Sequence, residues 1–450
     1  MHKVPSTFHS VNTTERIRAL DIMRGIVLLG ILLMNINGFG LVNAYANPTV
    51  SGGAEGLNLY TWIATNLFFE GTMRGLFSLL FGIGMFILLN RSQERGAGIA
   101  GPDIYFRRLT WLLFFGLVHG YLLLWTGEIL YDYALMGFLV YSFRNMAPKK
   151  LLLIAAFLVS VGTFWNYVEH QNNIKMLEDV AIAKTNLAAG KTLTEEQEAA
   201  TKKWEKIEKK KSPAFVNEYN EKMRSGYITI VKHLAPKNME SDTVWFYEWD
   251  LWDILSMMLI GIALFKRNIF SAEKSYRFYG LMVAAGYIIG LSINYYEIQL
   301  ILNDNFSFIA FSKSNITYYL GRLAIATGHI GAIMILVKAP VLMWLKRRLA
   351  AVGQMALTNY IMHSVICMIV FTGVGFGLFG KLQRYELLFV VMGIWIFQLI
   401  ASPIWLKHFE FGPIEWLWRR LSYLQKPVFK KKAQPGIKLV AREAISISQV

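Results

Sequence analysis

The densest group of chemically capable residues in the sequence lies between two apolar runs. It holds His119, then a short polar turn that ends in Glu128, and then Asp132. A histidine close to a carboxylate can take a proton from a hydroxyl or an amine, while the carboxylate orients the ring and stabilises its charged form. We therefore predict His119 as a general base, with Glu128 or Asp132 as its partner. The alternative is that these residues only form hydrogen bonds between helices.

Two pairs of opposite charges lie within or beside apolar runs. Asp21 and Arg24 are about one helical turn apart. This spacing predicts either a local ion pair or a binding site for a phosphate-bearing ligand, because the arginine guanidinium can donate two hydrogen bonds to one phosphate. Glu70 and Arg74 are four residues apart, and this spacing would let them pair on one face of a helix. Charged groups inside a membrane are costly, so each is a candidate for function.

Further polar residues in the apolar runs extend this set. Asn35 lies in the outer half of the first run, and Arg322 lies near the outer start of the eighth. Asn359 and His363 share a helix face because they are four residues apart. For each of them a structural link between helices is the alternative. The substrate-binding residues that we predict are Asp21, Arg24, Asn35, Arg74, Arg322, Asn359 and His363.

The elements that must position these residues are membrane helices. Of the 450 residues, 54% are hydrophobic and 17% are charged, whereas soluble domains carry about 25% charged residues. Apolar runs long enough to cross a bilayer core of roughly 30 Å recur along the chain. We expect an all-α polytopic membrane protein with about ten transmembrane helices, at 20–43, 59–90 (broken near Gly71), 106–124, 130–144, 150–168, 250–266, 277–301, 316–337, 352–373 and 385–406.

The basic residues fix the expected orientation of these helices. With a cytoplasmic N-terminus, the short inner segments hold 27 Lys and Arg residues and the short outer loops hold 3. Positive residues are retained on the cytoplasmic side, so we expect both termini there. The net charge of +16 is thereby explained by topology, and we expect no nucleic-acid partner. The expected location is the bacterial cytoplasmic (inner) membrane, with multiple passes.

A long polar segment divides the chain. Residues 169–243 hold 13 basic and 12 acidic residues and follow an odd-numbered span, so we expect a helical extracytoplasmic insert. It is either a lid over an outer site or a solvated excursion. Thr194 to Gln197 reads as a capping box that starts a helix, and Ser212-Pro213 ends that helix or starts another. The expected units are membrane helices 1–5 (1–168), the insert (169–243), membrane helices 6–10 with an interfacial anchor (244–425), and a basic cytoplasmic tail (426–450).

Several motifs together resemble one family of bacterial membrane proteins. They are Leu20 to Gly25 (LDIMRG), Arg107-Arg108 to His119-Gly120, Gly127 to Leu130 (GEIL), Leu357 to Tyr360 (LTNY) and Phe411 to Trp418 (FGPIEWLW). The pattern resembles the YeiB family, catalogued as domain of unknown function 418. The resemblance covers most of the chain outside the insert.

The YeiB family is similar in turn to the transmembrane acyltransferases, which include the type-3 acyltransferases and the lysosomal heparan glucosaminide acetyltransferase. This wider resemblance implies transfer of an acyl group from cytoplasmic acyl-CoA to an acceptor, often a sugar, on the far side. Type-3 acyltransferases place a histidine where this chain has Asn35, and the lysosomal enzyme uses a histidine of the following outer loop, which residues 44–58 lack. His119 is the replacement base that we expect.

Two function hypotheses follow. In the first, a transmembrane acyltransferase takes acyl-CoA, with acetyl-CoA as the expected donor, near Arg24, and His119 deprotonates the acceptor. In the second, a transporter or permease moves a small polar or anionic molecule past the same buried residues. The expected partners are the lipid bilayer, acyl-CoA and an extracytoplasmic carbohydrate or other acceptor, with a homodimer left open. We expect no metal, and the single cysteine, Cys367, excludes a disulfide within the chain.

Overall fold

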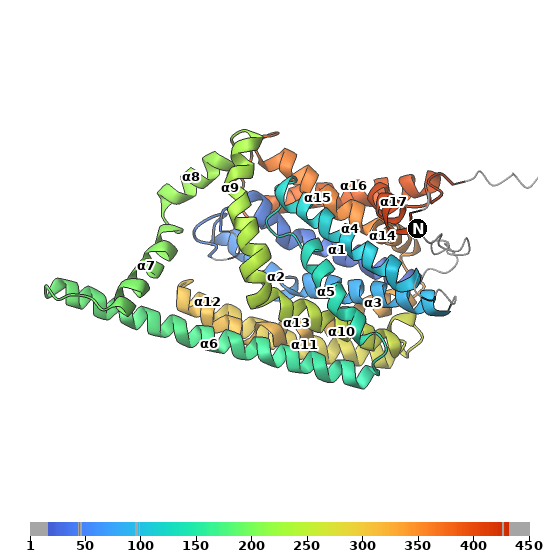
Figure 1. Ribbon diagram of the computed structural model, residues 1–450, viewed down its shortest axis with the longest axis horizontal. Coiled ribbons are helices and arrows are strands. Elements are labelled where there is room, and N and C mark those ends of the chain that lie inside the picture. Colours follow the sequence, from blue (N-terminus) through green and yellow to red (C-terminus); the bar gives the residue numbers. More distant parts are fainter. Residues whose placement is uncertain are drawn as a thin grey trace, which may run out of the picture.

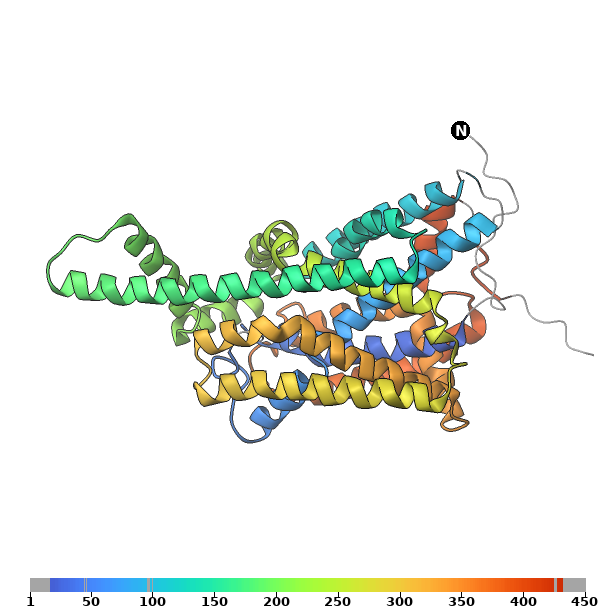
Figure 2. The same ribbon diagram turned by 90° about the horizontal axis from the view of Figure 1, so that it is seen from below.

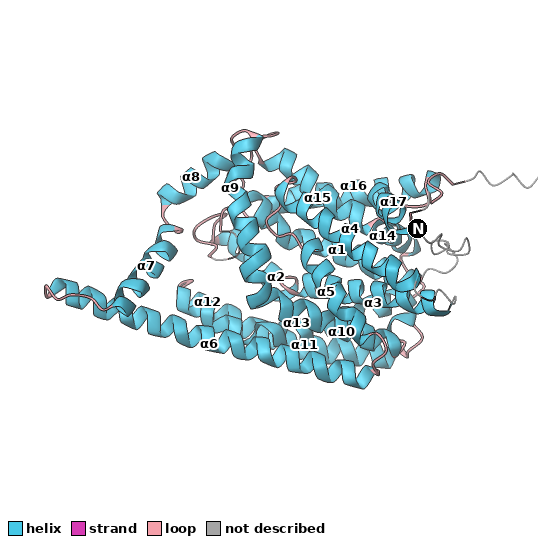
Figure 3. Ribbon diagram, in the orientation of Figure 1, coloured by secondary structure: helices cyan, strands magenta, loops and turns pink. Residues whose placement is uncertain are grey.

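Residues 17–43, 45, 47–94, 98, 100–424 and 427–431 are described by the computed structural model. Over these residues the protein is a bundle of helices without strands, and the nearest approach to a sheet is an isolated bridge between Phe409 and Lys430 (Figure 3). The all-α prediction is confirmed. Most of the predicted tail, 426–450, lies outside the described residues.

The first part of the chain folds into helices that run back and forth along one axis (Figure 1). These are α1 (Arg18–Gly40), α2 (Gly56–Phe68), α3 (Thr72–Glu94), α4 (Ala100–Tyr121), α5 (Leu130–Phe143) and α6 (Pro148–Ala188). The predicted break in the second apolar run is confirmed at Gly71, which has a φ of +67°. Glycine adopts this left-handed conformation without steric cost, so the chain changes direction between α2 and α3.

The insert is helical, and its first helix continues from the apolar run at 150–168. Helix α6 extends without interruption through residue 169 to Ala188 and beyond the rest of the bundle (Figure 2). The predicted capping box is confirmed, because the Thr194 hydroxyl accepts from the Gln197 N–H and the Gln197 side chain accepts in return. Ser212 caps the next helix, with Pro213 in its first turn. The insert helices are α7 (Glu195–Lys209), α8 (Pro213–Met223) and α9 (Tyr227–Glu240).

The last part of the chain returns to the bundle through a π-helix at Ser241–Asp250. It contains α10 (Leu251–Lys266), α11 (Tyr276–Asn303), α12 (Phe308–Ser314), α13 (Tyr318–Lys338), α14 (Met343–Gln354), α15 (Ala356–Phe371), α16 (Leu387–His408) and α17 (Pro413–Tyr423), with 3-10 turns at Ile269–Ser271 and Asn315–Thr317. Helices α14 and α15 meet at a bend of 82°.

Within the described part of the chain, six helical segments are long and apolar enough to cross a membrane, and the bent pair α14–α15 makes a seventh if it counts as one span. The predicted runs at 106–124, 130–144 and 250–266 form α4, α5 and α10, which are shorter or carry more charge. The protein is therefore a helical chain with several membrane-type segments. The count of ten crossings stays a prediction.

Close packing of α1 against α14 places the first motif. A Cβ on Gly353 would lie 1.9 Å from the Asp21 carbonyl oxygen, and one on Gly25 would lie 2.1 Å from the Leu349 carbonyl oxygen. Only glycine permits this approach of two backbones. It holds the Asp21–Arg24 turn against the α14–α15 bend, at the same end of the bundle as α17 (Figure 1).

Candidate functional site

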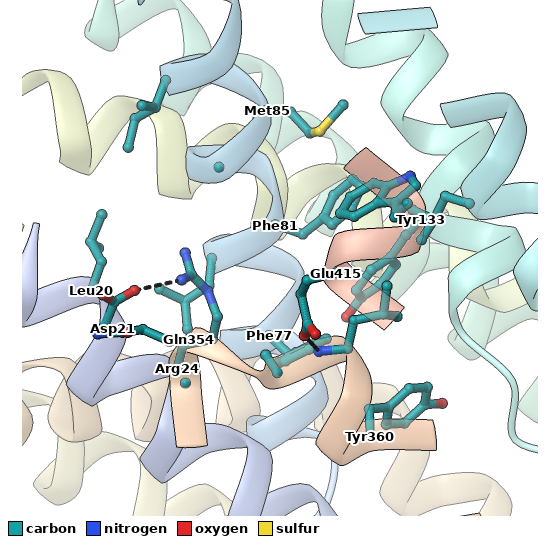
Figure 4. Close-up of a pocket in the computed structure, with 18 of the residues that line it drawn as sticks. Leu20, Asp21, Arg24, Phe77, Phe81, Met85, Tyr133, Gln354, Tyr360 and Glu415 are labelled. Carbon is teal, nitrogen blue, oxygen red and sulfur yellow. Dashed lines mark hydrogen bonds and ion pairs between the residues drawn. The ribbon is translucent and has the colours of Figure 1, made fainter. Parts of the chain in front are cut away.

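A cavity of about 280 Å³ lies at the end of the bundle where α1 begins (Figure 4). We call it the inner cavity. Asp21 and Arg24 both line it and form an ion pair of 3.0 Å, so the predicted local pair is confirmed. Three more arginines, Arg91, Arg108 and Arg419, line the same cavity among aromatic and aliphatic side chains. A surface of this kind suits a ligand that joins phosphates to an apolar part.

Glu415 explains why two of the sequence motifs lie together at this cavity. Its carboxylate accepts hydrogen bonds from the backbone N–H groups of Leu357 (2.7 Å) and Thr358 (3.0 Å) at the start of α15. Trp418, from the same helix as Glu415, donates to the Arg108 carbonyl oxygen and lies 3.8 Å from the Arg108 guanidinium. The C-terminal motif thus caps α15 and holds α4 beside the cavity.

A second cavity, of about 630 Å³, lies toward the insert end of the bundle. We call it the outer cavity. Four of the predicted site residues line it, namely Asn35, Arg74, Glu128 and Asp132. Its other walls include the insert residues Lys210, Tyr219, His233 and Lys237, and Trp245 of the π-helix that follows the insert. Aromatic faces beside carboxylate and amide groups are suited to a polar ligand with apolar edges, such as a sugar.

The first turn of α5 separates the two cavities. Leu130 and Tyr133 line the inner cavity, whereas Glu128, Ile129 and Asp132 line the outer one. We call this wall, together with the buried side chains of α4 and α15 that bond behind it, the partition. The two cavities share no lining residue.

His119 lies within the partition and is fully buried. Its Nδ1 is 3.1 Å from a carboxylate oxygen of Glu128, and its Nε2 is 2.6 Å from the hydroxyl of Ser364. The imidazole packs edge-on against Tyr360, with 5.0 Å between ring centroids. The structure therefore brings His119 and Glu128 together as predicted. The ring lines neither cavity itself, but it touches Tyr360 on the inner wall and Glu128 on the outer wall.

Glu128 and Asp132 have different surroundings although both line the outer cavity. The Glu128 carboxylate accepts from the backbone N–H groups of Leu130 and Tyr131, each at 2.8 Å, and so caps α5. Gly116 makes room for it, because a Cβ there would lie 2.6 Å from the carboxylate. Asp132 makes no hydrogen bond or ion pair with another described residue, and neither does the side chain of Asn35. Both are therefore available to a ligand.

The predicted pairing of Glu70 with Arg74 is wrong. Arg74 binds Asp250 and Asp253, the latter at 2.8 Å. Glu70 instead binds Arg322 at 2.9 Å. The reason is the break at Gly71, which puts Glu70 outside α3 and turns its side chain away from Arg74.

Arg322 belongs to a side cavity of about 90 Å³ rather than to the outer cavity proper. It is bound by Glu70 and Glu297 and stacks over Tyr318. Both carboxylates are engaged with Arg322. Its contacts are therefore those of an ion cluster that joins the turn between α2 and α3 to α11 and α13.

Asn359 and His363 share a face of α15, as predicted, but that face packs against α16. Asn359 bonds Ser402 at 3.0 Å, and His363 bonds Gln398 at 3.0 Å. Neither lines the inner or the outer cavity. Their contacts match the structural alternative, a polar link between two helices.

The structure adds site residues that the sequence patterns did not indicate. Ser364 reaches His119 from a part of the chain 245 residues away. His233 lines the outer cavity from α9, and its Nε2 is buried without a partner among the described residues. Burial, together with Lys222 and Lys237, lowers the pKa of His233 below its ordinary value, so its ring is neutral at pH 7. No signal in the sequence links these positions, apart from the predicted placement of the insert on the outer side.

Comparison with known proteins identifies the family to which this chain belongs. The family model described as "Protein of unknown function (DUF418)" matches residues 264–425. The uncharacterized protein YxaH of Bacillus subtilis (strain 168) is 27% identical over 95% of this chain and 99% of its own length. The uncharacterized protein YeiB of Escherichia coli (strain K12) is 30% identical over 91% of this chain and 96% of its own length. The chain belongs to the YeiB family.

Within the YeiB family, the likeness extends over both halves of the site. The family model spans α15 and α17 and so includes Ser364 and Glu415, while His119 and Glu128 lie in the part covered by the two relatives. No solved structure matches this chain. Among the described residues, no group of three His, Cys, Asp or Glu side chains is arranged to hold a metal ion.

Proposed function

We propose that the protein is a transmembrane acyltransferase that takes an acyl group from cytoplasmic acyl-CoA, with acetyl-CoA as the donor. The acceptor is a hydroxyl or amine of an extracytoplasmic molecule, with carbohydrate as the preferred class. The observation that carries this proposal is the pair of cavities that approach from opposite ends of the bundle and are separated only by the partition that holds His119.

The inner cavity has the composition that a CoA ester requires. Arg24 and Arg108 supply positive charge, and Phe77, Leu80 and Phe81 supply an apolar path toward Tyr133 in the partition. The phosphates would lie among the arginines at the mouth, and the acyl thioester would point inward. A thioester is already activated, so positioning and one base are enough for transfer.

The outer cavity supplies the groups that an acceptor needs. Asn35 and Asp132 offer an amide and a carboxylate that have no partner among the described residues, and Trp125 and Trp245 offer aromatic faces. In this proposal His119 handles the proton and Glu128 orients the ring through Nδ1. These are the roles of base and orienting carboxylate that the sequence predicted. The acceptor's proton moves to His119 inside the partition.

The proposal includes a topology with ten crossings and both termini on the cytoplasmic side of the bacterial cytoplasmic membrane. The supporting arrangement is that α14, α17 and the start of α1 lie at one end of the bundle, while α7, α8 and α12 lie at the other (Figure 1). Helices α1, α3, α4, α5, α6, α10, α11, α13, α15 and α16 would be the crossing segments.

The test is binding and consumption of acetyl-CoA by the purified full-length protein in nanodiscs. We expect acetyl-CoA to bind, and we expect thiol release when a panel of mono- and disaccharides is added. His119→Gln should bind acetyl-CoA normally but lose turnover by about 10²–10⁴-fold, because an amide cannot accept the proton at neutral pH. If the wild-type protein neither binds acetyl-CoA nor releases CoA, the proposal fails. Saturable sugar flux into proteoliposomes in its place would establish the transporter alternative.

A further inference from the structure

Three side chains in the partition form a chain of hydrogen bonds of the kind that activates a nucleophile. The hydroxyl of Ser364 lies 2.6 Å from Nε2 of His119, and Nδ1 of the same ring lies 3.1 Å from Glu128. With the ring proton on Nδ1, the imidazole donates to the carboxylate and accepts from the serine. This is the order of roles in which a serine becomes nucleophilic, and it is recognised by geometry rather than by sequence position.

The carboxylate member of this chain is held rigidly. Glu128 is fixed by the backbone N–H groups of Leu130 and Tyr131, so its oxygen cannot rotate away from the imidazole. Serine and histidine are both 0% exposed, which excludes bulk water from the serine–histidine contact. Exclusion of water strengthens the hydrogen bonds and protects an ester intermediate from hydrolysis.

Ser364 lies on the path from the inner cavity toward the outer one. Leu357 and Tyr360 line the inner cavity, and Ser364 follows Tyr360 by four residues on the same face of α15. Beyond it, Ser364 and Cys367 line a hollow of about 20 Å³. That hollow shares Gly38, Thr126 and Tyr219 with the outer cavity.

We propose that Ser364 is an acyl-accepting nucleophile that carries the acyl group across the partition, so that donor and acceptor never share one cavity. This inference rests on the proposed acyltransferase function and specifies its mechanism as two half-reactions. It also limits the acyl group, because a hollow of about 20 Å³ has room for little more than one water-sized group. An acetyl methyl fits it, and a long acyl chain does not.

In the first half-reaction the Ser364 oxygen attacks the thioester carbonyl, and His119 takes the hydroxyl proton. The C–S bond breaks, and His119 returns that proton to the departing sulfur, so CoA leaves as the thiol. In the second half-reaction an acceptor hydroxyl or amine from the outer cavity attacks the serine ester. His119 takes the acceptor's proton and gives it to the Ser364 oxygen as the ester bond breaks. No oxidant, reductant or metal is consumed.

This mechanism can be tested without knowing the acceptor, because the first half-reaction is complete in itself. The full-length protein is incubated with acetyl-CoA and isotope-labelled free CoA, and label transfer into acetyl-CoA is measured. Peptide mass spectrometry of the quenched protein then locates any acetyl group. We expect exchange of label and one acetyl group on Ser364.

Variants at the serine separate chemistry from folding. Ser364→Ala should abolish exchange and acetylation, whereas Ser364→Cys should retain an acetyl group as a thioester because a thiol is also a nucleophile. Ser402→Ala is the matched control, since Ser402 is 1% exposed, lies on α16 and bonds Asn359 rather than His119. It should exchange at the wild-type rate at equal amounts of folded protein.

Two results would overturn the serine mechanism and leave the acyltransferase proposal standing. In the first, the wild-type protein transfers acetyl groups to an acceptor but exchanges no CoA label when the acceptor is absent, and Ser364→Ala transfers acetyl groups at a rate within a few-fold of wild type. The other is an acetyl group found on a residue other than Ser364. A wild-type protein that neither binds nor consumes acetyl-CoA would instead remove the proposed function itself.

Discussion

Glu128 and Asp132 provide a matched pair for separating a structural carboxylate from a functional one. Both line the outer cavity, and the Glu128 side chain and Asp132 are both largely buried. Glu128 accepts two backbone hydrogen bonds and contacts His119, whereas Asp132 has no partner among the described residues. We therefore expect Glu128→Gln to destabilise the fold and Asp132→Asn to leave it as stable or make it more stable.

The magnitude for Glu128→Gln follows from the bonds that are lost. A glutamine keeps one acceptor oxygen, so one of the two N–H groups at the start of α5 is left without a partner. A hydrogen bond to a charged group is worth about 1.5–3 kcal/mol, and a negative charge at a helix N-terminus is worth about 0.3–1 kcal/mol. The expected loss is about 2–4 kcal/mol in the free energy of unfolding. Asp132→Asn loses no bond and removes the cost of a buried charge.

The assay is unfolding of the detergent-solubilised protein by titration with SDS, followed by tryptophan fluorescence. Acetyl-CoA exchange is measured on the same samples below the transition. Asp132→Asn should exchange CoA at the wild-type rate but transfer poorly to an acceptor, because Asp132 faces only the outer cavity. If Asp132→Asn destabilises the protein as much as Glu128→Gln does, the carboxylate has a structural partner and our assignment of it to the acceptor site is wrong.

Further predictions concern the donor, the topology and the insert. Arg24→Ala should weaken acetyl-CoA binding, and Arg24→Lys should restore it only in part, since lysine cannot donate two parallel hydrogen bonds to one phosphate. If a binding titration shows unchanged affinity for Arg24→Ala, the role of Arg24 is only its ion pair with Asp21. An impermeant thiol reagent added outside whole cells should label Lys209→Cys and not Lys149→Cys, and the opposite pattern would reverse the topology. Because burial lowers the pKa of His233, the folded protein binds that proton less readily than the unfolded chain does. Stability is therefore lost as the pH falls below about 6.5. The melting temperature should drop more on acidification for the wild type than for His233→Gln, and equal drops would contradict the lowered pKa.

Local patterns in the sequence were enough for the elements and for some close contacts. The apolar runs predicted an all-helical chain, the Thr194–Gln197 pattern predicted the start of α7, and the three-residue spacing predicted the Asp21–Arg24 pair. Each of these depends on interactions within a few residues. His119 and Glu128 were also predicted together, because a tight turn between two antiparallel helices brings residues on either side of it into contact.

Contacts between distant segments were decided by the tertiary structure alone. Glu70 was expected to bind Arg74, but the left-handed backbone at Gly71 redirects it to Arg322, which is 252 residues away. Asn359 and His363 were expected at a substrate site, but the packing of α15 on α16 turns them toward Ser402 and Gln398.

Ser364 shows most clearly the difference between what local sequence patterns predict and what tertiary packing decides. It follows His363 in an otherwise apolar run, and it meets His119 only because the folded bundle brings α4 and α15 together at this point. The sequence by itself determined which segments are helices and which polar residues lie within them, because the 3.6-residue period and the cost of burying charge act locally. Which of those residues face a cavity, and which face another helix, depends on how helices far apart in the chain pack together, and only the tertiary structure decided that.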